Sequence, residues 1–417
     1  MNSKPTLWGE VDEQGRLVFP PEMAAQFGLS PGAMFRVENG GNRIQMHRPV
    51  THLTKVYVEP TDRCNIACRT CIRNGWDKDL GQMSEETFER ILSGIEKLEP
   101  KPTVFFGGLG EPLFHKHTLA WIARAKAAGA RVELITNGTM LTEKRSRQII
   151  DSGLDVIWVS IDGATPESYA DVRLGAHLPK VLENLARFRK MRRGGHYPRP
   201  EIGIAFVAMA RNIDDLPEVL RIGRSVGAKH FSVSNVLPYT ADMQSDMLYT
   251  RTLTNMAHMS SPTQARLSLP RMDINPKTQD AFLKALQSGY NINFAGNNLS
   301  SAADVCNFIE SGTMSNGWDG GVSPCWPLMH THTSYLHGKP HLSRRHVVGN
   351  VNDQDLLDIW LDEEYVAYRQ KVQSFGFAPF TFCGGCDLSE ANEEDCFGNE
   401  FPACGSCLWS QGVIQCP

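Results

Sequence analysis

The sequence has few features of a membrane or secreted protein. No apolar run reaches the ~18 residues that a transmembrane helix needs. The first residues lack the apolar segment of a secretory signal, so we expect a cytoplasmic protein. The formal net charge of the 417 residues is only −4, which argues against nucleic acid as the main partner because phosphate binding needs excess Lys and Arg. Hydrophobic residues make up 41%, which is enough for the cores of more than one domain.

Cysteine is absent from a long central stretch, because none of the 11 cysteines lies between Cys71 and Cys306. Scattered structural cysteines would not leave such a gap. In an intracellular chain, clustered cysteines indicate metal binding rather than disulfides. The first cluster is Cys64-x3-Cys68-x2-Cys71. The second cluster contains the remaining cysteines: Cys306, Cys325, Cys383, Cys386, Cys396, Cys404, Cys407 and Cys416.

Residues 52 to about 240 alternate short apolar strands with amphipathic helices in six βα repeats. Strands that are apolar on both faces are typical of a parallel sheet covered by helices. The pattern therefore predicts an α/β fold with a partial (β/α)6 barrel. Gly-rich or polar segments follow the strands, at the end of such barrels where catalytic groups lie.

The spacing of Cys64, Cys68 and Cys71 places three thiolates on one short loop. Three thiolates can hold three corners of a [4Fe–4S] cluster and leave one iron open for a chelating substrate. A structural zinc site would need a fourth ligand, and no further Cys or His is near in the sequence.

This motif, after the first strand of a six-repeat α/β unit, resembles the core of radical S-adenosylmethionine (SAM) enzymes. The resemblance implies a SAM-binding [4Fe–4S] cluster, an electron donor such as ferredoxin or flavodoxin, and reductive cleavage of SAM to a 5′-deoxyadenosyl radical. The stretch Gly107-Gly-Leu-Gly-Glu-Pro112 resembles the loop of this family that meets the SAM amino group. One departure is Thr70, where the family usually has an aromatic residue that packs toward adenine.

The resemblance also implies further SAM contacts where later strands end. Ser160 and Asp162 would lie near the SAM carboxylate or ribose, and Asn235 near the ribose. A capping role at a strand end is the alternative for such polar residues. The complete set of implied SAM-binding residues is Gly107, Gly108, Gly110, Glu111, Pro112, Asn137, Ser160, Asp162 and Asn235.

The C-terminal cysteines resemble the SPASM domain, an auxiliary iron–sulfur module of peptide- and protein-modifying radical SAM enzymes. Cys306, Gly320-x4-Cys325 and Cys383-x2-Cys386 follow its pattern, whereas the later spacing departs from it and adds one cysteine. Eight thiolates could complete two auxiliary [4Fe–4S] clusters, or one complete and one open cluster. The alternative is a zinc ribbon on the pairs Cys383–Cys386 and Cys404–Cys407.

A stretch with five histidines, residues 330–346, also suggests a metal site. We prefer core or solvated histidines, because alternation in His330-Thr-His332-Thr indicates a strand and the cysteines already account for the expected metals.

Residues 1–50 are predicted to form a small β-rich unit with the order β-α-β-β. Gly15-Arg-Leu-Val-Phe-Pro20 and Gly28-Leu-Ser-Pro-Gly32 resemble the swapped-hairpin domain of AbrB-like transcription factors. The unit is too short to bury a core alone, and the resemblance implies a homodimer that interleaves two chains. Its acidic and basic residues balance, so DNA binding has little support.

The chain therefore divides into an AbrB-like unit (1–50), a radical SAM core (52–240), a connecting or substrate region (241–305) and a SPASM-like domain (306–417). The last residues, 395–417, resemble maturases associated with tungsten-cofactor oxidoreductases. The predicted function is a radical SAM maturase that modifies a peptide or protein, in the assembly of such an oxidoreductase. The alternatives are a radical SAM dehydrogenase of a small molecule and an iron–sulfur DNA-binding regulator.

Overall fold

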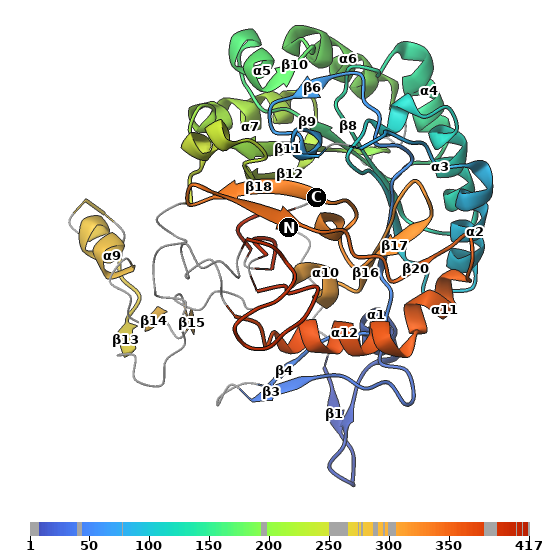
Figure 1. The fold of residues 1–417 in the computed structure, drawn as a ribbon, viewed down its shortest axis with the longest axis vertical. Coiled ribbons are helices and arrows are strands. Elements are labelled where there is room, and N and C mark those ends of the chain that lie inside the picture. The colour runs from blue at the N-terminus through green and yellow to red at the C-terminus, as the bar shows by residue number, and fades with distance from the viewer. Residues whose placement is uncertain are drawn as a thin grey trace.

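A curved nine-stranded sheet forms the centre of the protein in the computed structural model, with helices on its outer side (Figure 1). The strand order is β12-β11-β9-β8-β7-β5-β16-β17-β20. The structure describes residues 8–39, 44–76, 78–192, 198–249, 266–273, 275–276, 278–286, 291–294, 297–298, 306–378, 390–405, 407–410 and 412–415.

Six parallel strands follow one another in sequence order and form the predicted partial barrel. They are β5 (Lys55–Val58), β7 (Thr103–Phe106), β8 (Val132–Thr136), β9 (Val156–Ser160), β11 (Glu201–Ala208) and β12 (Ala228–Asn235). The helices that connect and cover them are α2 (Glu85–Glu96), α3 (Thr118–Ala127), α4 (Glu143–Asp151), α5 (Pro166–Val172), α6 (Leu178–Met191) and α7 (Leu216–Ser225). Short 3₁₀ turns are η1 (Ile72–Gly75), η2 (Pro112–Phe114), η3 (Ile213–Asp215) and η4 (Ala241–Asp246).

The sequence explains these helices through caps and apolar faces. Ser84 accepts a hydrogen bond from the Thr87 backbone N–H and caps the start of α2. Phe88 on α2 stacks on Trp121 of α3 with ring centroids 4.6 Å apart, and both side chains are fully buried. The helices thus bury their apolar faces against the strands and against one another.

The cysteine-rich region continues the barrel sheet instead of forming a separate sheet. β16 (Thr313–Asn316) pairs in parallel with β5, and β17 (Gly321–Ser323) and β20 (Gly349–Asn350) extend the sheet antiparallel. The other elements here are α10 (Asn307–Glu310), η6 (Trp326–Leu328), the hairpin β18 (His332–Leu336) and β19 (Lys339–Ser343), α11 (Leu356–Leu361) and α12 (Glu363–Ser374).

The segment from Leu356 to Ser374 forms two helices, α11 and α12, instead of one. Asp362 interrupts it with a non-helical backbone (φ −53°, ψ 134°) and accepts a hydrogen bond from the Tyr365 backbone N–H. An Asp side chain favours such a cap over a helix interior, because it satisfies a free backbone donor.

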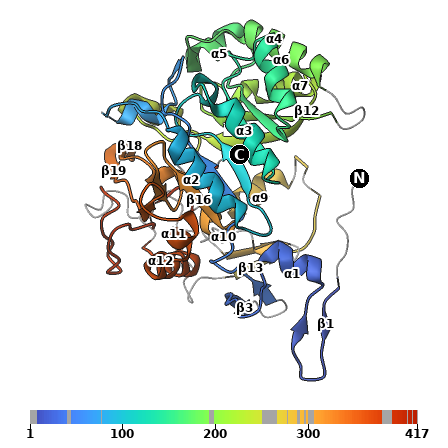
Figure 2. The same cartoon turned by 90° about the vertical axis from the view of Figure 1, so that its right-hand side faces the viewer.

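The N-terminal unit protrudes from the body of the protein (Figure 2). It contains the hairpin β1 (Glu10–Val11) and β2 (Leu17–Val18), then α1 (Pro21–Phe27), then the hairpin β3 (Val37–Asn39) and β4 (Ile44–Met46). The predicted order lacked β1, because Glu10–Val11 is not part of an apolar run such as Leu17-Val-Phe19, which marks β2.

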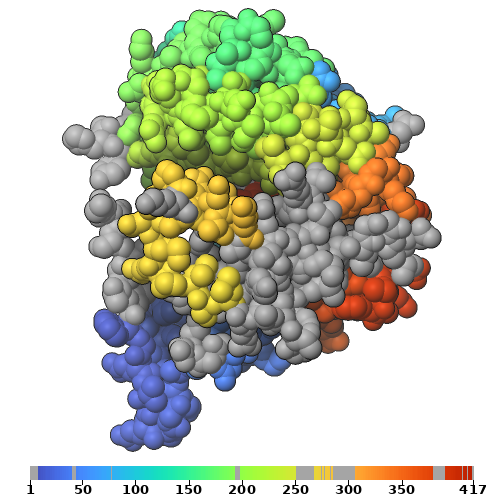
Figure 3. Space-filling model, turned by 90° about the vertical axis from the view of Figure 1, so that its left-hand side faces the viewer, coloured from blue at the N-terminus to red at the C-terminus, as the bar shows by residue number. Residues whose placement is uncertain are grey.

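The region between the barrel and the cysteine-rich part contains small elements. They are β13 (Arg266–Leu269), α9 (Gln279–Leu286), β14 (Asn291–Phe294) and β15 (Asn297–Asn298), with the three strands in one sheet. Figure 3 shows these elements between the barrel and the N-terminal unit. Of all the helices that the structure describes, none combines the length and the apolar character needed to cross a membrane.

Arg369 fastens α12 to the segment that enters β5. Its side chain is fully buried, with the guanidinium carbon 3.7 Å from the Trp360 ring centroid and 3.9 Å from that of Tyr365. Arg369 Nε donates to the Val50 carbonyl at 2.9 Å and Nη2 donates to the Trp360 carbonyl at 2.6 Å. The buried cation is therefore compensated by two carbonyls and two aromatic faces.

We expect Arg369→Ala to lower the free energy of unfolding by about 3 kcal/mol, because it leaves buried carbonyls without donors and opens a cavity. Gln370→Ala, one residue further on an exposed position of the same helix, is the matched control. Urea unfolding of both variants measures the difference. Equal stability of the two variants would contradict this account of Arg369.

Candidate active site

The first cysteine cluster lies on the loop that follows β5. Cys68 belongs to β6 (Ala67–Cys68), which pairs antiparallel with β10 (Arg173–Leu174). The Cys71 backbone N–H donates to the Cys68 carbonyl at 3.2 Å, so the chain turns back on itself here. Cys64, Cys68 and Cys71 consequently line one pocket at the carboxyl ends of the barrel strands.

Two arginines donate to the thiols of this loop. Arg73 Nε lies 3.2 Å from Cys71 Sγ, and Arg173 Nη1 lies 3.5 Å from Cys68 Sγ. Burial raises the pKa of the Cys64 and Cys68 thiols, so their thiolate forms need nearby positive charge. The two guanidiniums supply part of that charge. Three thiols with cationic donors fit a [4Fe–4S] cluster that keeps one iron open.

The predicted SAM loop packs directly on the start of the cysteine loop. Gly108 has a φ of +144°, and a Cβ there would lie 2.6 Å from Glu59 Cγ. A Cβ on Gly110 would lie 2.3 Å from the Thr61 carbonyl oxygen. Only glycine permits this approach, and Gly108 and Gly110 line the pocket.

The other residues of this loop shape it from behind or hold it in place. Gly107 faces Phe105 and Ile135, since a Cβ there would lie 2.5 Å from the Phe105 ring. Pro112 begins η2 and is buried. Its neighbour Glu111 lines the pocket but is only 2% exposed.

Glu111 ties the loop to the end of β8. Its carboxylate accepts hydrogen bonds from Thr136 Oγ1 at 2.8 Å, from the Asn137 backbone N–H at 2.7 Å and from the Leu113 backbone N–H at 3.1 Å. Burial raises the pKa of Glu111, although these donors oppose that effect. Asn137 also lines the pocket and donates to the Asn65 side chain at 2.9 Å. The structure therefore places Asn137 beside the cysteine loop, and Glu111 as a structural acceptor.

Ser160 and Asp162 separate in the structure. Ser160 lines the pocket, whereas Asp162 is fully buried behind it. Asp162 Oδ1 accepts from the Val207 backbone N–H at 2.7 Å, and Oδ2 lies 2.6 Å from Arg173 Nε. Asp162 thus orients Arg173, which lines the pocket in its place. Neither Arg173 nor Arg73 was predicted from the sequence; Arg73 stands two residues after Cys71, whereas Arg173 has no comparable signal in the sequence.

Asn235 lines the pocket but already has a partner in the C-terminal tail. Its Nδ2 donates to the Val413 carbonyl at 2.9 Å, and the Gln415 backbone N–H donates to Ser234 Oγ at 2.9 Å. These bonds attach the tail to the end of β12, the last strand of the partial barrel. The tail therefore helps to close the side of the pocket that six strands leave open.

Aromatic side chains from the cysteine-rich region complete the pocket. Trp326 and Trp409 line it together with Tyr239, which follows β12. The indole N–H groups of both tryptophans are buried and have no hydrogen-bond partner among the described residues. These side chains give the pocket an aromatic surface, which Thr70 does not supply at the family's usual position. Residues of the barrel and of the cysteine-rich region therefore both line the pocket.

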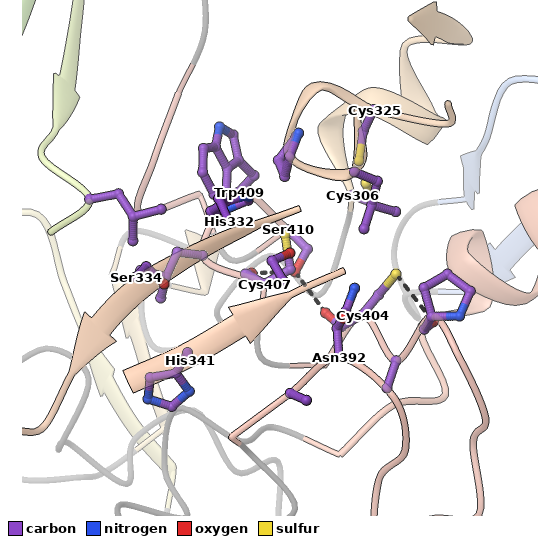
Figure 4. A pocket seen from close by; sticks show the side chains of 18 of the residues that line it. Cys306, Cys325, His332, Ser334, His341, Asn392, Cys404, Cys407, Trp409 and Ser410 are labelled. Carbon is purple, nitrogen blue, oxygen red and sulfur yellow. Dashed lines mark hydrogen bonds between the residues drawn. The ribbon is translucent and has the colours of Figure 1, made fainter. Parts of the chain in front are cut away.

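Four of the second group of cysteines line a different cavity (Figure 4). Two come from the elements beside β16 and two from the tail: Cys306, Cys325, Cys404 and Cys407. Burial raises the pKa of Cys306 to about 12 and raises those of the other three thiols as well. Tyr368 Oη lies 3.3 Å from Cys404 Sγ.

These four thiols share one cavity, and four thiolates are the ligand set of a [4Fe–4S] cluster. Among the residues that the structure describes, no group of three or more Cys, His, Asp or Glu could hold one metal ion. The cavity is lined mainly by apolar side chains, and such shielding from solvent is one of the factors that set the potential of an iron–sulfur cluster.

Of the remaining predicted ligands, the structure describes Cys396, which does not line this cavity. Cys396 is exposed on a turn organised by Asp395, whose carboxylate accepts from the backbone N–H groups of Phe397 and Asn399. Cys383, Cys386 and Cys416 lie outside the described residues.

The histidine-rich stretch belongs to the core at its start, as preferred from the sequence. His330 and His332 are buried, and His332 Nδ1 lies 2.9 Å from the His330 carbonyl. Burial lowers the pKa of His332 to about 4, so this ring is neutral.

Comparisons with known proteins agree with this organisation. The model of the radical SAM superfamily matches residues 58–199, and the model of the SPASM iron–sulfur cluster-binding domain matches residues 306–387. The tungsten-containing aldehyde ferredoxin oxidoreductase cofactor-modifying protein of Pyrococcus furiosus is 30% identical over 366 residues, which are 87% of this chain and 96% of that protein. Pre-heme d1 synthase of Dinoroseobacter shibae is 28% identical over 180 residues, 42% of each chain.

Solved structures share the fold. SuiB of Streptococcus suis bound to the precursor peptide SuiA has a TM-score of 0.52 at 14% identity, over 79% of this chain and 68% of SuiB. Native anSMEcpe with bound AdoMet has a TM-score of 0.50 at 16% identity, over 86% of this chain and 96% of that one. These motifs, pockets and relatives show that the chain belongs to the radical SAM superfamily, as an enzyme with a SAM-binding [4Fe–4S] site and a C-terminal SPASM domain for auxiliary iron–sulfur clusters.

Proposed function

We propose that this radical SAM enzyme is a maturase that modifies a peptide or protein during the maturation of a tungsten-dependent oxidoreductase. The relationship to the Pyrococcus protein carries the proposal, because it extends over 87% of this chain and 96% of that protein. The name of that relative links it to a tungsten-containing aldehyde ferredoxin oxidoreductase.

The pocket supports radical chemistry on a bound substrate. When bound, the cluster and SAM supply a 5′-deoxyadenosyl radical, which removes a hydrogen atom from the substrate. Cys64, Cys68 and Cys71 would hold the cluster, and the loop from Gly107 to Pro112 would position SAM. The aromatic walls of Trp326 and Trp409 would exclude water and hold the substrate beside that site.

We also propose that Cys306, Cys325, Cys404 and Cys407 form one auxiliary cluster site. Their shared apolar cavity supports this grouping. Cys383, Cys386, Cys396 and Cys416 would then remain for a second auxiliary site, which gives three clusters in total with the SAM-binding one. An external donor such as ferredoxin or flavodoxin would supply the electrons.

A small molecule is the second candidate substrate. The phrase "cofactor-modifying" in the name of the Pyrococcus relative favours it, because the substrate would then be a cofactor and not the polypeptide. Mass spectrometry of the tungsten oxidoreductase polypeptide, before and after incubation with the reconstituted enzyme, SAM and reductant, separates the two. A mass change on the polypeptide supports the protein substrate, and a change confined to the released cofactor supports the small molecule.

The N-terminal unit would contribute a contact surface for a second copy of the chain. Many large apolar side chains in it are exposed: Trp8, Val11, Leu17, Met34, Val37 and Ile44. A two-stranded hairpin is marginal alone, so burying these side chains against a second copy would stabilise it.

Deleting residues 1–46 is expected to convert a dimer to a monomer while leaving SAM cleavage largely intact. The deletion keeps residues 47–50, which hydrogen-bond to the body of the protein; for example, Gln373 Nε2 donates to the Arg48 carbonyl at 2.9 Å. The double variant Val37→Ser and Ile44→Ser is the milder test, because it removes only exposed apolar groups. Light scattering measures the mass, and a dimer that survives both changes would contradict this role.

A further inference from the structure

A buried hydrogen-bonded network joins the SPASM region to the SAM loop, and the cluster sites described above do not use it. It centres on Glu59, directly after β5, and on His330, two residues before β18. Their side chains are 0% and 2% exposed. His330 Nε2 lies 2.8 Å from Glu59 Oε2, and the Leu109 backbone N–H donates to Glu59 Oε1 at 3.1 Å. Leu109 stands between Gly108 and Gly110, so the network reaches the middle of the SAM loop.

Lys78 determines which nitrogen of the His330 imidazole accepts a hydrogen bond and which one donates. Its ammonium lies 2.7 Å from His330 Nδ1 and 3.1 Å from Asp62 Oδ2, and 4.6 Å from the centroid of the Trp76 ring. An ammonium group can only donate, so His330 Nδ1 accepts and His330 Nε2–H donates to Glu59. The imidazole is thereby fixed in one tautomer and one orientation.

Asp62 fixes the other end of the network. It is fully buried and accepts from the Gly81 backbone N–H at 2.7 Å and from Trp318 Nε1 at 2.9 Å. Trp318 belongs to the SPASM region, whereas Asp62 stands two residues before Cys64. Residues of the barrel and of the SPASM region therefore both hold the network in place.

We propose that His330 is a positioning residue for SAM: through Glu59 it holds the Leu109 amide and thereby the shape of the SAM loop. The inference rests on the proposed placement of SAM at this loop. Glycine backbones on both sides of Leu109 have little conformational preference of their own, so the loop depends on such anchors. Without the imidazole, the buried Glu59 carboxylate loses a charge-assisted hydrogen bond and must find water or move. Because His330 belongs to the SPASM region, SAM binding at the loop depends on the correct packing of that region against the barrel.

The test compares His330→Leu with His330→Gln in the full-length protein with its clusters reconstituted. The probe is SAM, and its Kd is measured by equilibrium dialysis together with iron content per chain. We expect His330→Leu to weaken SAM binding about tenfold or more, as loss of a buried charged hydrogen bond implies. His330→Gln should recover most of the affinity, because its amide can donate to Glu59. Neither variant should lose iron, because His330 lines neither of the two cysteine-containing pockets described above.

Two controls separate the possible failures. His177→Leu makes the same change at an exposed position and should bind SAM normally. Gly110→Ala should abolish SAM binding because its Cβ would meet the Thr61 carbonyl; if it does not, the placement of SAM at the loop is wrong. If His330→Leu binds SAM with unchanged affinity while Gly110→Ala no longer binds SAM, the proposed role of His330 is wrong and the placement of SAM still stands. If His330→Leu does not fold, Lys78→Met decides: the proposal expects weaker SAM binding, and unchanged affinity overturns it.

Discussion

Replacing Cys64, Cys68 or Cys71 with Ala is expected to abolish the release of 5′-deoxyadenosine from SAM and to leave the auxiliary iron in place. Each thiol is one of only three ligands on the loop, and loss of one leaves too few to hold a cube. The auxiliary thiols lie in a separate cavity, so they should load independently.

Iron content and SAM turnover of the purified, reconstituted variants measure this separation. About four irons should be lost from each variant, with the auxiliary absorption retained. Cys325→Ala is the reciprocal control, because it should lose auxiliary iron and keep the cluster that binds SAM. A near wild-type rate of SAM cleavage in any of the three loop variants would show that the assignment of this cluster is wrong.

The second large effect is expected from the auxiliary cavity. Wild-type protein should hold about twelve irons as three [4Fe–4S] clusters, and replacing Cys306, Cys325, Cys404 or Cys407 with Ala should remove about four of them. The four variants should behave alike, because their thiols line the same cavity. Cys396→Ala should spare this cluster, since Cys396 is exposed and lies outside that cavity.

Metal analysis and Mössbauer spectroscopy distinguish the outcomes. If Cys404→Ala and Cys407→Ala remove zinc instead of iron, the two residues belong to a zinc ribbon. Iron near eight per chain with one zinc in the wild type would lead to the same conclusion.

Local patterns in the sequence were sufficient to predict the barrel. Periodic apolar residues mark the helices that cover the strands, such as α4 (Glu143–Asp151) and α6 (Leu178–Met191). The cysteine loop was predictable for the same reason, because its ligands lie within eight consecutive residues. When the ligands of a site are close in the sequence, their spacing is enough to predict the site.

Long-range pairing accounts for what the sequence did not show. β16 joins β5 although more than 250 residues separate them, so the SPASM region could not be seen to extend the barrel sheet. Asp162 appeared to face SAM, but Arg173 occupies its carboxylate and lines the pocket instead. His330 could be placed in the core from its strand pattern, yet its partner Glu59 is 271 residues away. Such pairs depend on the assembled fold, and no local pattern encodes them.

The release of 5′-deoxyadenosine from SAM tests the central claim most directly. Anaerobically reconstituted protein, SAM and reductant are incubated with and without the tungsten oxidoreductase polypeptide, and the nucleoside is quantified. We expect slow release alone, faster release with the polypeptide, and none from Cys68→Ala. The absence of 5′-deoxyadenosine from a preparation that holds all its iron would contradict radical SAM activity, and release that the polypeptide leaves unchanged would contradict the proposed substrate.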